Sequence, residues 1–244
     1  MKKFFLLLAV ALFALPSLAS LARDFEYNGL TYTVLDEDAR ICETKAGEGS
    51  TPGNYVEGDL VIPSTVYDGE NEYSVTKIGR SAFEGCGSLT SVEIPSSVTT
   101  IGMSAFSYCS GLTSVVIPDS VTSLFPYAFY HCEKLASVKI GDSVTEIVDY
   151  AFYACKALSS VEMGNSVNTI GFNAFGECTS LASIKLPDSV VTIDINAFSG
   201  CTALVSVEME NSVATIGLHA FSGCTALVSV ELGNSVTTID NYAF

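Results

Sequence analysis

The stretch "LTSVEIPSSVTTIGMSAFSYCSG", Leu89–Gly111, is one copy of a unit that recurs along most of the chain. An Ala-Phe pair marks each copy, and its phenylalanine returns every 23 residues without insertion or deletion. Such a fixed period indicates a structural module of constant length. The repeated phenylalanines are Phe83, Phe106, Phe129, Phe152, Phe175, Phe198, Phe221 and Phe244, and the cysteines that keep the same period are Cys86, Cys109, Cys132, Cys155, Cys178, Cys201 and Cys224.

Each unit predicts a short strand, a turn and a compact closing segment. Apolar and polar residues alternate in "SVEIP", which is typical of a half-buried strand. In most copies proline or glycine and then Asp or Asn precede a serine that is found in every copy, which favours a turn whose backbone the serine hydroxyl would bond. A second apolar pair, such as Val98 and Ile101, leads to Ala105, Phe106 and Cys109, and the spacing of the last two predicts a short helical turn.

One unit cannot bury its own apolar residues, whereas stacked units bury a continuous column of them. Equivalent strands should then pair in parallel, about 4.8 Å apart. The sequence therefore predicts an α/β solenoid shaped as a curved rod, with a parallel β-sheet on the concave face and short helical turns on the convex face.

The unit L-x-x-V-x-I-P-x-S-V-x-x-I-x-x-x-A-F-x-x-C resembles the BspA-type, or treponemal-type, leucine-rich repeat. The resemblance covers about Val75 to Phe244, as seven full copies and part of an eighth. It implies the leucine-rich repeat fold in a bacterial protein that binds other proteins. It also implies adhesion, either to host extracellular matrix proteins such as fibronectin and fibrinogen or to other microbes.

Three regions are expected along the chain: a signal peptide at residues 1–22, an N-terminal cap region at 23–74, and the leucine-rich repeat solenoid at 75–244. The cap region should contain a hairpin around Asn28 and Gly29, a two-residue turn sequence, followed by a first irregular repeat. The chain stops at Phe244, within a repeat. We expect either a fragment of a longer polypeptide or an open end that is covered by self-association.

The first 22 residues carry Lys2 and Lys3, then the apolar run "FFLLLAVALFAL" and the small residues "PSLASLA". This pattern predicts cleavage after Ala22, with Ala19 as the alternative, and export to the cell surface or beyond. No later apolar stretch reaches the ~18 residues of a membrane span, so no transmembrane helix should remain after cleavage. The net charge of −16 argues against nucleic acid as a partner.

Catalytic chemistry has little support in the sequence. His131 and His219 occupy positions where other copies carry Tyr, Ser, Asn or Ala, which indicates ordinary surface residues. His131 and Cys132 are adjacent in sequence and should not face one another. No HExxH, P-loop or GxSxG motif is present, so we expect neither an enzyme nor a bound cofactor or metal.

The cysteines of an exported protein raise the question of disulfides. Equivalent residues of stacked coils project in parallel, which would keep Cβ atoms about 5 Å apart, whereas a disulfide prefers about 3.8 Å. The sequence therefore predicts buried free thiols. The Asp and Asn residues that follow the strands form another row, which is expected to serve the turns rather than calcium: Asp119, Asp142, Asn165, Asp188, Asn211 and Asn234.

The outward positions of the strands are the candidate binding site. A row of charged or apolar residues runs beside a row of serines, which suits a flat protein-binding surface. An alternative is that the repeats form a passive scaffold or stalk that displays a missing C-terminal domain. The candidate residues are Ser91, Glu93, Ser114, Val116, Ser137, Lys139, Ser160, Glu162, Ser183, Lys185, Ser206, Glu208, Ser229 and Glu231.

Overall fold

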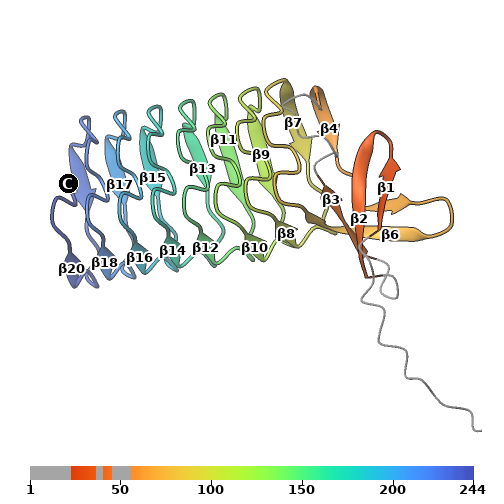
Figure 1. Ribbon diagram of the computed structural model, residues 1–244. Coiled ribbons are helices and arrows are strands. Elements are labelled where there is room, and N and C mark those ends of the chain that lie inside the picture. The colour runs from red at the N-terminus through yellow and green to blue at the C-terminus, as the bar shows by residue number, and fades with distance from the viewer. Residues whose placement is uncertain (1–22, 37–40, 46–55) are drawn as a thin grey trace, which may run out of the picture.

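A computed structural model describes residues 23–36, 41–45 and 56–244 of the chain. The predicted signal peptide, residues 1–22, lies outside these described residues. From about residue 56 onward the chain winds into coils that stand side by side, from the cap at one end to Phe244 at the other (Figure 1). The predicted solenoid is therefore confirmed.

A parallel sheet of longer strands lines one side of the coils. Its side chains alternate as predicted, so that in β9 Val115 and Ile117 are buried while Val116 is exposed. The strands follow in two groups, which are β4 (Gly58–Val61), β7 (Leu89–Glu93), β9 (Ser114–Ile117), β11 (Ser137–Ile140) and β13 (Ser160–Glu162), then β15 (Ser183–Lys185), β17 (Ser206–Glu208) and β19 (Ser229–Glu231).

A second parallel sheet, of two-residue strands, was not predicted from the sequence. In each coil it uses the second apolar pair, so that Ile101 in β8 is buried beside Leu124 in β10. Figure 1 shows these short strands along the opposite edge of the stack. They are β8 (Thr100–Ile101), β10 (Ser123–Leu124), β12 (Glu146–Ile147), β14 (Thr169–Ile170), β16 (Thr192–Ile193), β18 (Thr215–Ile216) and β20 (Thr238–Ile239).

The predicted helical turns are wrong, because no helix occurs in the described part of the chain. Around the Ala-Phe pair, successive backbone N–H groups donate alternately to the next coil and to a carbonyl of their own coil. Phe106 N donates to Ala128 O of the next coil at 2.8 Å, whereas Cys109 N donates back to Phe106 O at 3.2 Å. A helix would use all of these N–H groups internally. Positive φ angles at Ser104 and Tyr108, 56° and 59°, allow the alternation and break any helix.

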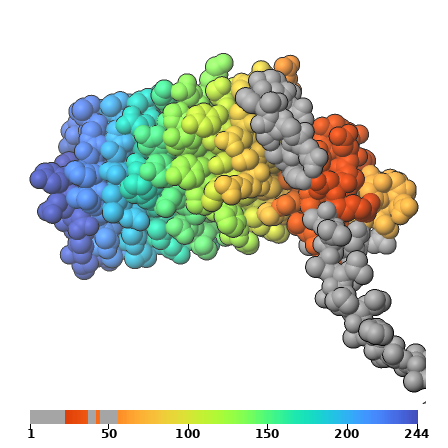
Figure 2. Space-filling model, viewed as in Figure 1, coloured from red at the N-terminus to blue at the C-terminus, as the bar shows by residue number. Residues whose placement is uncertain are grey.

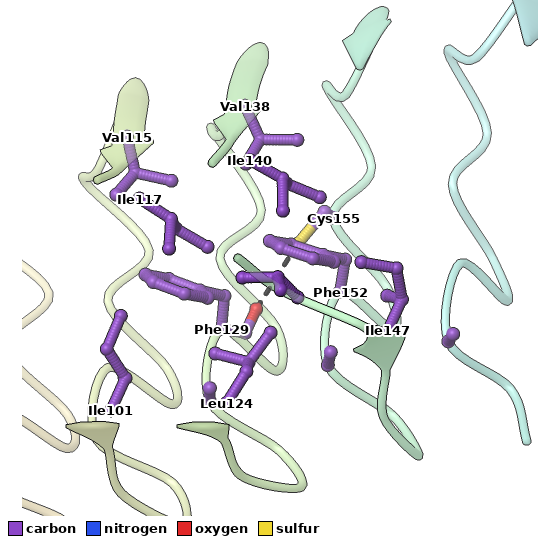
Figure 3. Packing of buried hydrophobic residues seen from close by; sticks show 14 of the residues in the cluster. Ile101, Val115, Ile117, Leu124, Phe129, Val138, Ile140, Ile147, Phe152 and Cys155 are labelled. Carbon is purple, nitrogen blue, oxygen red and sulfur yellow. Dashed lines mark hydrogen bonds between the residues drawn. The ribbon is translucent and has the colours of Figure 1, made fainter. Parts of the chain in front are cut away.

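The core is a column of stacked side chains. The rings from Phe83 to Phe244 follow one another with centroids 5.2–5.4 Å apart and planes within 13° of parallel. In Figure 3, Ile117 of β9 lies over the ring of Phe129, Ile140 of β11 lies over the ring of Phe152, and Leu124 approaches from the β10 side. Each such ring pair contributes about 0.5–1.5 kcal/mol beyond its buried area.

The cysteines of the repeat are free thiols within this column, and all but Cys224, which is half-buried, are fully buried. Each thiol from Cys109 to Cys224 donates to a phenylalanine carbonyl of the preceding coil at 3.1–3.3 Å, as Cys155 Sγ does to Phe129 O (Figure 3). Burial also raises the pKa of the Cys155 thiol well above its ordinary value.

The repeated serine bonds to a different part of the backbone from the one expected. Ser189 Oγ donates to Val167 O at 2.6 Å, which lies in the preceding coil and not in the turn that carries the serine. Ser97 and Ser120 make the equivalent bond at 2.7 Å. The hydroxyl therefore connects neighbouring coils.

The N-terminal region continues both sheets. β1 (Asp24–Tyr27) and β2 (Leu30–Asp36) form the predicted hairpin, with Asn28 and Gly29 at φ 49° and 78°. β2 pairs with β3 (Ile41–Lys45), which runs parallel to β6 (Glu72–Ile78), and β6 pairs with both β5 (Thr65–Tyr67) and β8. Buried Tyr32, Val34 and Tyr73 join the same apolar cluster as the coils. Figure 2 shows this region at one end of the stack and the last coil at the other.

Candidate functional site

The outward positions predicted on the longer strands lie side by side within the two groups of paired strands. We call them the strand-face row. The row consists of the fourteen candidate residues from Ser91 to Glu231 named above, which are seven serines and the residue two positions after each serine. Their strands are in register, since Ser114 lies opposite Ser91 and Ser137, and Lys139 lies opposite Val116 and Glu162. In the second group Glu208 lies between Lys185 and Glu231. Parallel pairing of identical coils therefore brings these positions together.

Ion pairs link neighbouring coils along this row. Lys139 Nζ lies 2.5 Å from Glu162 Oε1, and Lys185 Nζ lies 3.7 Å from Glu208 Oε2 and 3.4 Å from Glu210 Oε1. The hydrogen bond and charge of Glu162 raise the pKa of Lys139. All of these side chains are more than one third exposed, so the pairs add little to stability and stay accessible to a partner.

Asp59 and Val61 extend the row and were missed in the sequence. β4 pairs with β7 so that Asp59 lies opposite Ser91 and Val61 opposite Glu93. Ser91 Oγ donates to Asp59 Oδ1 at 2.6 Å and Thr90 Oγ1 donates to it at 2.9 Å, and these bonds lower the pKa of the Asp59 carboxyl. Aligning "DLVIP" with "SVEIP" would have identified both residues, because the two segments occupy equivalent strand positions.

The surface is open rather than hollowed. A cavity of about 210 Å³ lies near its end, lined by Ser206, Glu208, Glu210, Ser229 and Glu231 among others. Small-molecule sites usually measure about 300–1,000 Å³ and are mostly apolar. Three carboxylates in a smaller depression fit that description poorly.

The two histidines lie beside tyrosine rings in the closing segments and not on the long strands. His131 is half-buried in a closing segment, where its ring centroid lies 5.2 Å from that of Tyr108 and 4.4 Å from that of Tyr130. His219 stacks on Tyr242 at 5.1 Å. The buried Cys132 thiol donates a hydrogen bond to Phe106 O at 3.2 Å. The thiol and the imidazole therefore have separate partners.

The row of Asp and Asn residues connects coils through the backbone. Asp119 Oδ1 accepts a hydrogen bond from Asp142 N at 3.0 Å, and Asp142 Oδ1 accepts one from Asn165 N at 2.8 Å. Within the described residues, no three His, Cys, Asp or Glu side chains gather as a group that could hold a metal ion. None of the described segments forms a helix long and apolar enough to cross a membrane.

Comparison with known proteins gives the family. The model described as "BspA type Leucine rich repeat region (6 copies)" matches residues 70–180 and 145–244, well over half of the chain. The chain belongs to this family. The BspA-type repeat therefore accounts for the 23-residue period and for the stacked column of phenylalanine and cysteine.

The chain is also similar to proteins of known structure. The Treponema pallidum leucine-rich repeat protein is 28% identical, with a TM-score of 0.51 over 87% of this chain and 82% of that one. The pneumococcal vaccine antigen PcpA is 19% identical with a TM-score of 0.45, over 91% and 84% of the two chains. A leucine-rich cell surface protein of Faecalibacterium prausnitzii is 20% identical with a TM-score of 0.35, over 86% and 94%. No curated protein matched the chain.

Proposed function

We propose that this BspA-type protein is exported and binds a protein partner through the strand-face row, as an adhesin for host matrix proteins or other cells. One observation carries the proposal: the row is a long, open surface on which charges of both signs are held in register by the coils. Such a surface suits an extended protein partner more than a small molecule. Adhesion is the role that the family resemblance implies, and the sequence of residues 1–22 supports export.

The proposal predicts that reversing the charges of the row abolishes binding. The probes are immobilised fibronectin and fibrinogen, and the variant carries Glu162→Lys, Lys185→Glu and Glu208→Lys. Surface plasmon resonance should show at least a tenfold loss of affinity, because charges placed opposite like charges on the partner repel.

A matched control uses Glu133→Lys, Lys156→Glu and Glu146→Lys, which change the net charge by the same amount. Glu133 and Lys156 also form an exposed ion pair between neighbouring coils, at 2.8 Å, outside the long strands. This control should bind like the unaltered chain. Equal affinity of the two triple variants would contradict a role for the strand-face row, and binding of neither probe by the unaltered chain would contradict adhesion to these matrix proteins.

A further inference from the structure

Seven aromatic side chains gather on the closing segments of the middle coils, away from the strand-face row. We call them the aromatic cluster. Tyr130 lies at its centre, with ring centroids of its neighbours 4.4–6.3 Å away. Tyr108 is 49% exposed and the others are half-buried, so the rings reach the surface. The members are Tyr108, Tyr127, Tyr130, His131, Tyr150, Tyr153 and Phe172.

The fold does not require these rings. At the position of Tyr127 and Tyr150, two residues before the repeated phenylalanine, four other coils carry Ser or Asn, whereas the last two carry His219 and Tyr242. At the position of Tyr108 and His131, three other coils carry glycine and two carry Ala154 and Glu177. The same coil therefore closes with small residues at both positions.

The backbone at these positions disfavours large side chains. Tyr108, Tyr127, His131 and Tyr150 have φ angles of 59°, 62°, 56° and 56°. Glycine and asparagine adopt this left-handed region readily, whereas a bulky residue there is strained. Most other coils place a small or polar residue at these positions, whereas the middle coils place four rings there.

Negative charge borders the cluster. Asp149 and Glu177 are exposed, and neither forms an ion pair with any described residue. Burial, the nearby Tyr150 and the charge of Asp149 together raise the pKa of Tyr127. Burial also raises the pKa of Tyr153, and the charge of Glu177 adds to that increase. Carboxylates beside ring surfaces are complementary to a cation.

We propose that the aromatic cluster binds a basic segment of a partner protein, whose arginine and lysine side chains stack on the tyrosine rings and pair with Asp149 and Glu177. A planar guanidinium can do both at once. The cluster lies on the closing segments and the strand-face row on the long strands, so the two surfaces use different residues of each coil. Both surfaces can therefore be occupied together, and this site does not depend on the function proposed for the row.

The test uses fluorescence anisotropy with a labelled nona-arginine peptide. The variant replaces four rings by the residues that other coils carry, Tyr127→Asn, Tyr150→Asn, Tyr130→Ser and Tyr153→Ser, and leaves the charge unchanged. Binding should weaken about tenfold or more. Circular dichroism melts check that the variant is folded, and the relief of strain at two positions favours this.

Two controls separate the rings from the overall negative charge. Tyr242→Asn removes an exposed tyrosine with the same φ of 56° in the last coil, and Tyr67→Ser removes one near the cap. Together these changes should leave the affinity unchanged. A four-ring variant that binds as tightly as the control would overturn the proposal, since attraction by net charge would then suffice. The proposal would also fail if a neutral sugar, maltohexaose, bound in a manner that needs the four tyrosines while the peptide did not.

Discussion

Single side chains of the repeat act as links between coils. The repeated cysteine from Cys109 onward and three of the repeated serines donate to a backbone carbonyl of the preceding coil, as Cys155 does to Phe129 and Ser189 to Val167. These carbonyls lie where the chain turns, and a buried acceptor left without a donor destabilises the fold. The repeat therefore keeps Cys and Ser for their donors as well as for their size.

Removing a repeated serine hydroxyl should lower the free energy of unfolding only in those coils where the hydroxyl donates a hydrogen bond to the preceding coil. Ser189→Ala should lower the free energy of unfolding by about 1 kcal/mol in urea titrations, because Val167 O loses its donor. Ser143 occupies the same position of another coil without such a bond, so Ser143→Ala should change stability by less than about 0.5 kcal/mol. Equal losses in the two variants would contradict the link.

At the scale of elements, the sequence predicted the stack, the long strands and the hairpin, but not the closing segment. The spacing of Phe106 and Cys109 fits a helical turn, and only the positive φ at Ser104 and Tyr108 excludes it. Neither residue is glycine, but glycine stands at the position of Tyr108 in three other coils, which was the one signal in the sequence that could have excluded a helix. Two-residue strands such as β10 are too short to show alternation. The aromatic cluster escaped notice because its residues vary between repeats, and alignment emphasises what repeats.

The junction between cap and coils depends on a close backbone approach at Gly79. Its N–H donates to Thr44 O at 2.9 Å, and an added Cβ would lie 2.2 Å from that oxygen. Gly79→Ala should therefore lower the free energy of unfolding by about 2 kcal/mol and expose the cap first to limited proteolysis. Gly87→Ala is the control, because its Cβ would meet only the movable Ser110 hydroxyl at 3.2 Å. Similar losses from both changes would contradict a tight junction.

The whole molecule is held by one continuous core, and its buried thiols make its stability depend on pH. Burial raises the pKa of Cys132, Cys155 and Cys178 above the ordinary 9.0. The folded chain therefore keeps these protons at a pH at which the unfolded chain releases them. Stability from this source is complete below pH 9 and declines as the pH rises beyond it.

The triple variant Cys132→Ala, Cys155→Ala, Cys178→Ala should be less stable at neutral pH but lose stability more slowly in alkali. Each thiol contributes about 1.4 kcal/mol per pH unit well above pH 9, so the slope should be shallower by about 4 kcal/mol per unit. Urea midpoints between pH 8 and 10.5 measure it. The control Val121→Ala, Val144→Ala, Val167→Ala removes buried side chains that do not titrate and should keep the steep slope. Parallel slopes in the cysteine variant would contradict protonated, unpaired thiols in the folded chain.

The constant coil has a consequence for the gene. Residues 197–208 and 220–231 are identical in sequence, and their long strands pair with neighbouring strands in the same register. Unequal exchange between such similar DNA segments would delete or duplicate one whole coil and leave the remaining contacts matched. The rod could then change its reach in steps of about 4.8 Å while each surviving coil kept its shape. Lineages of this protein should therefore differ in copy number more readily than in the length of the unit.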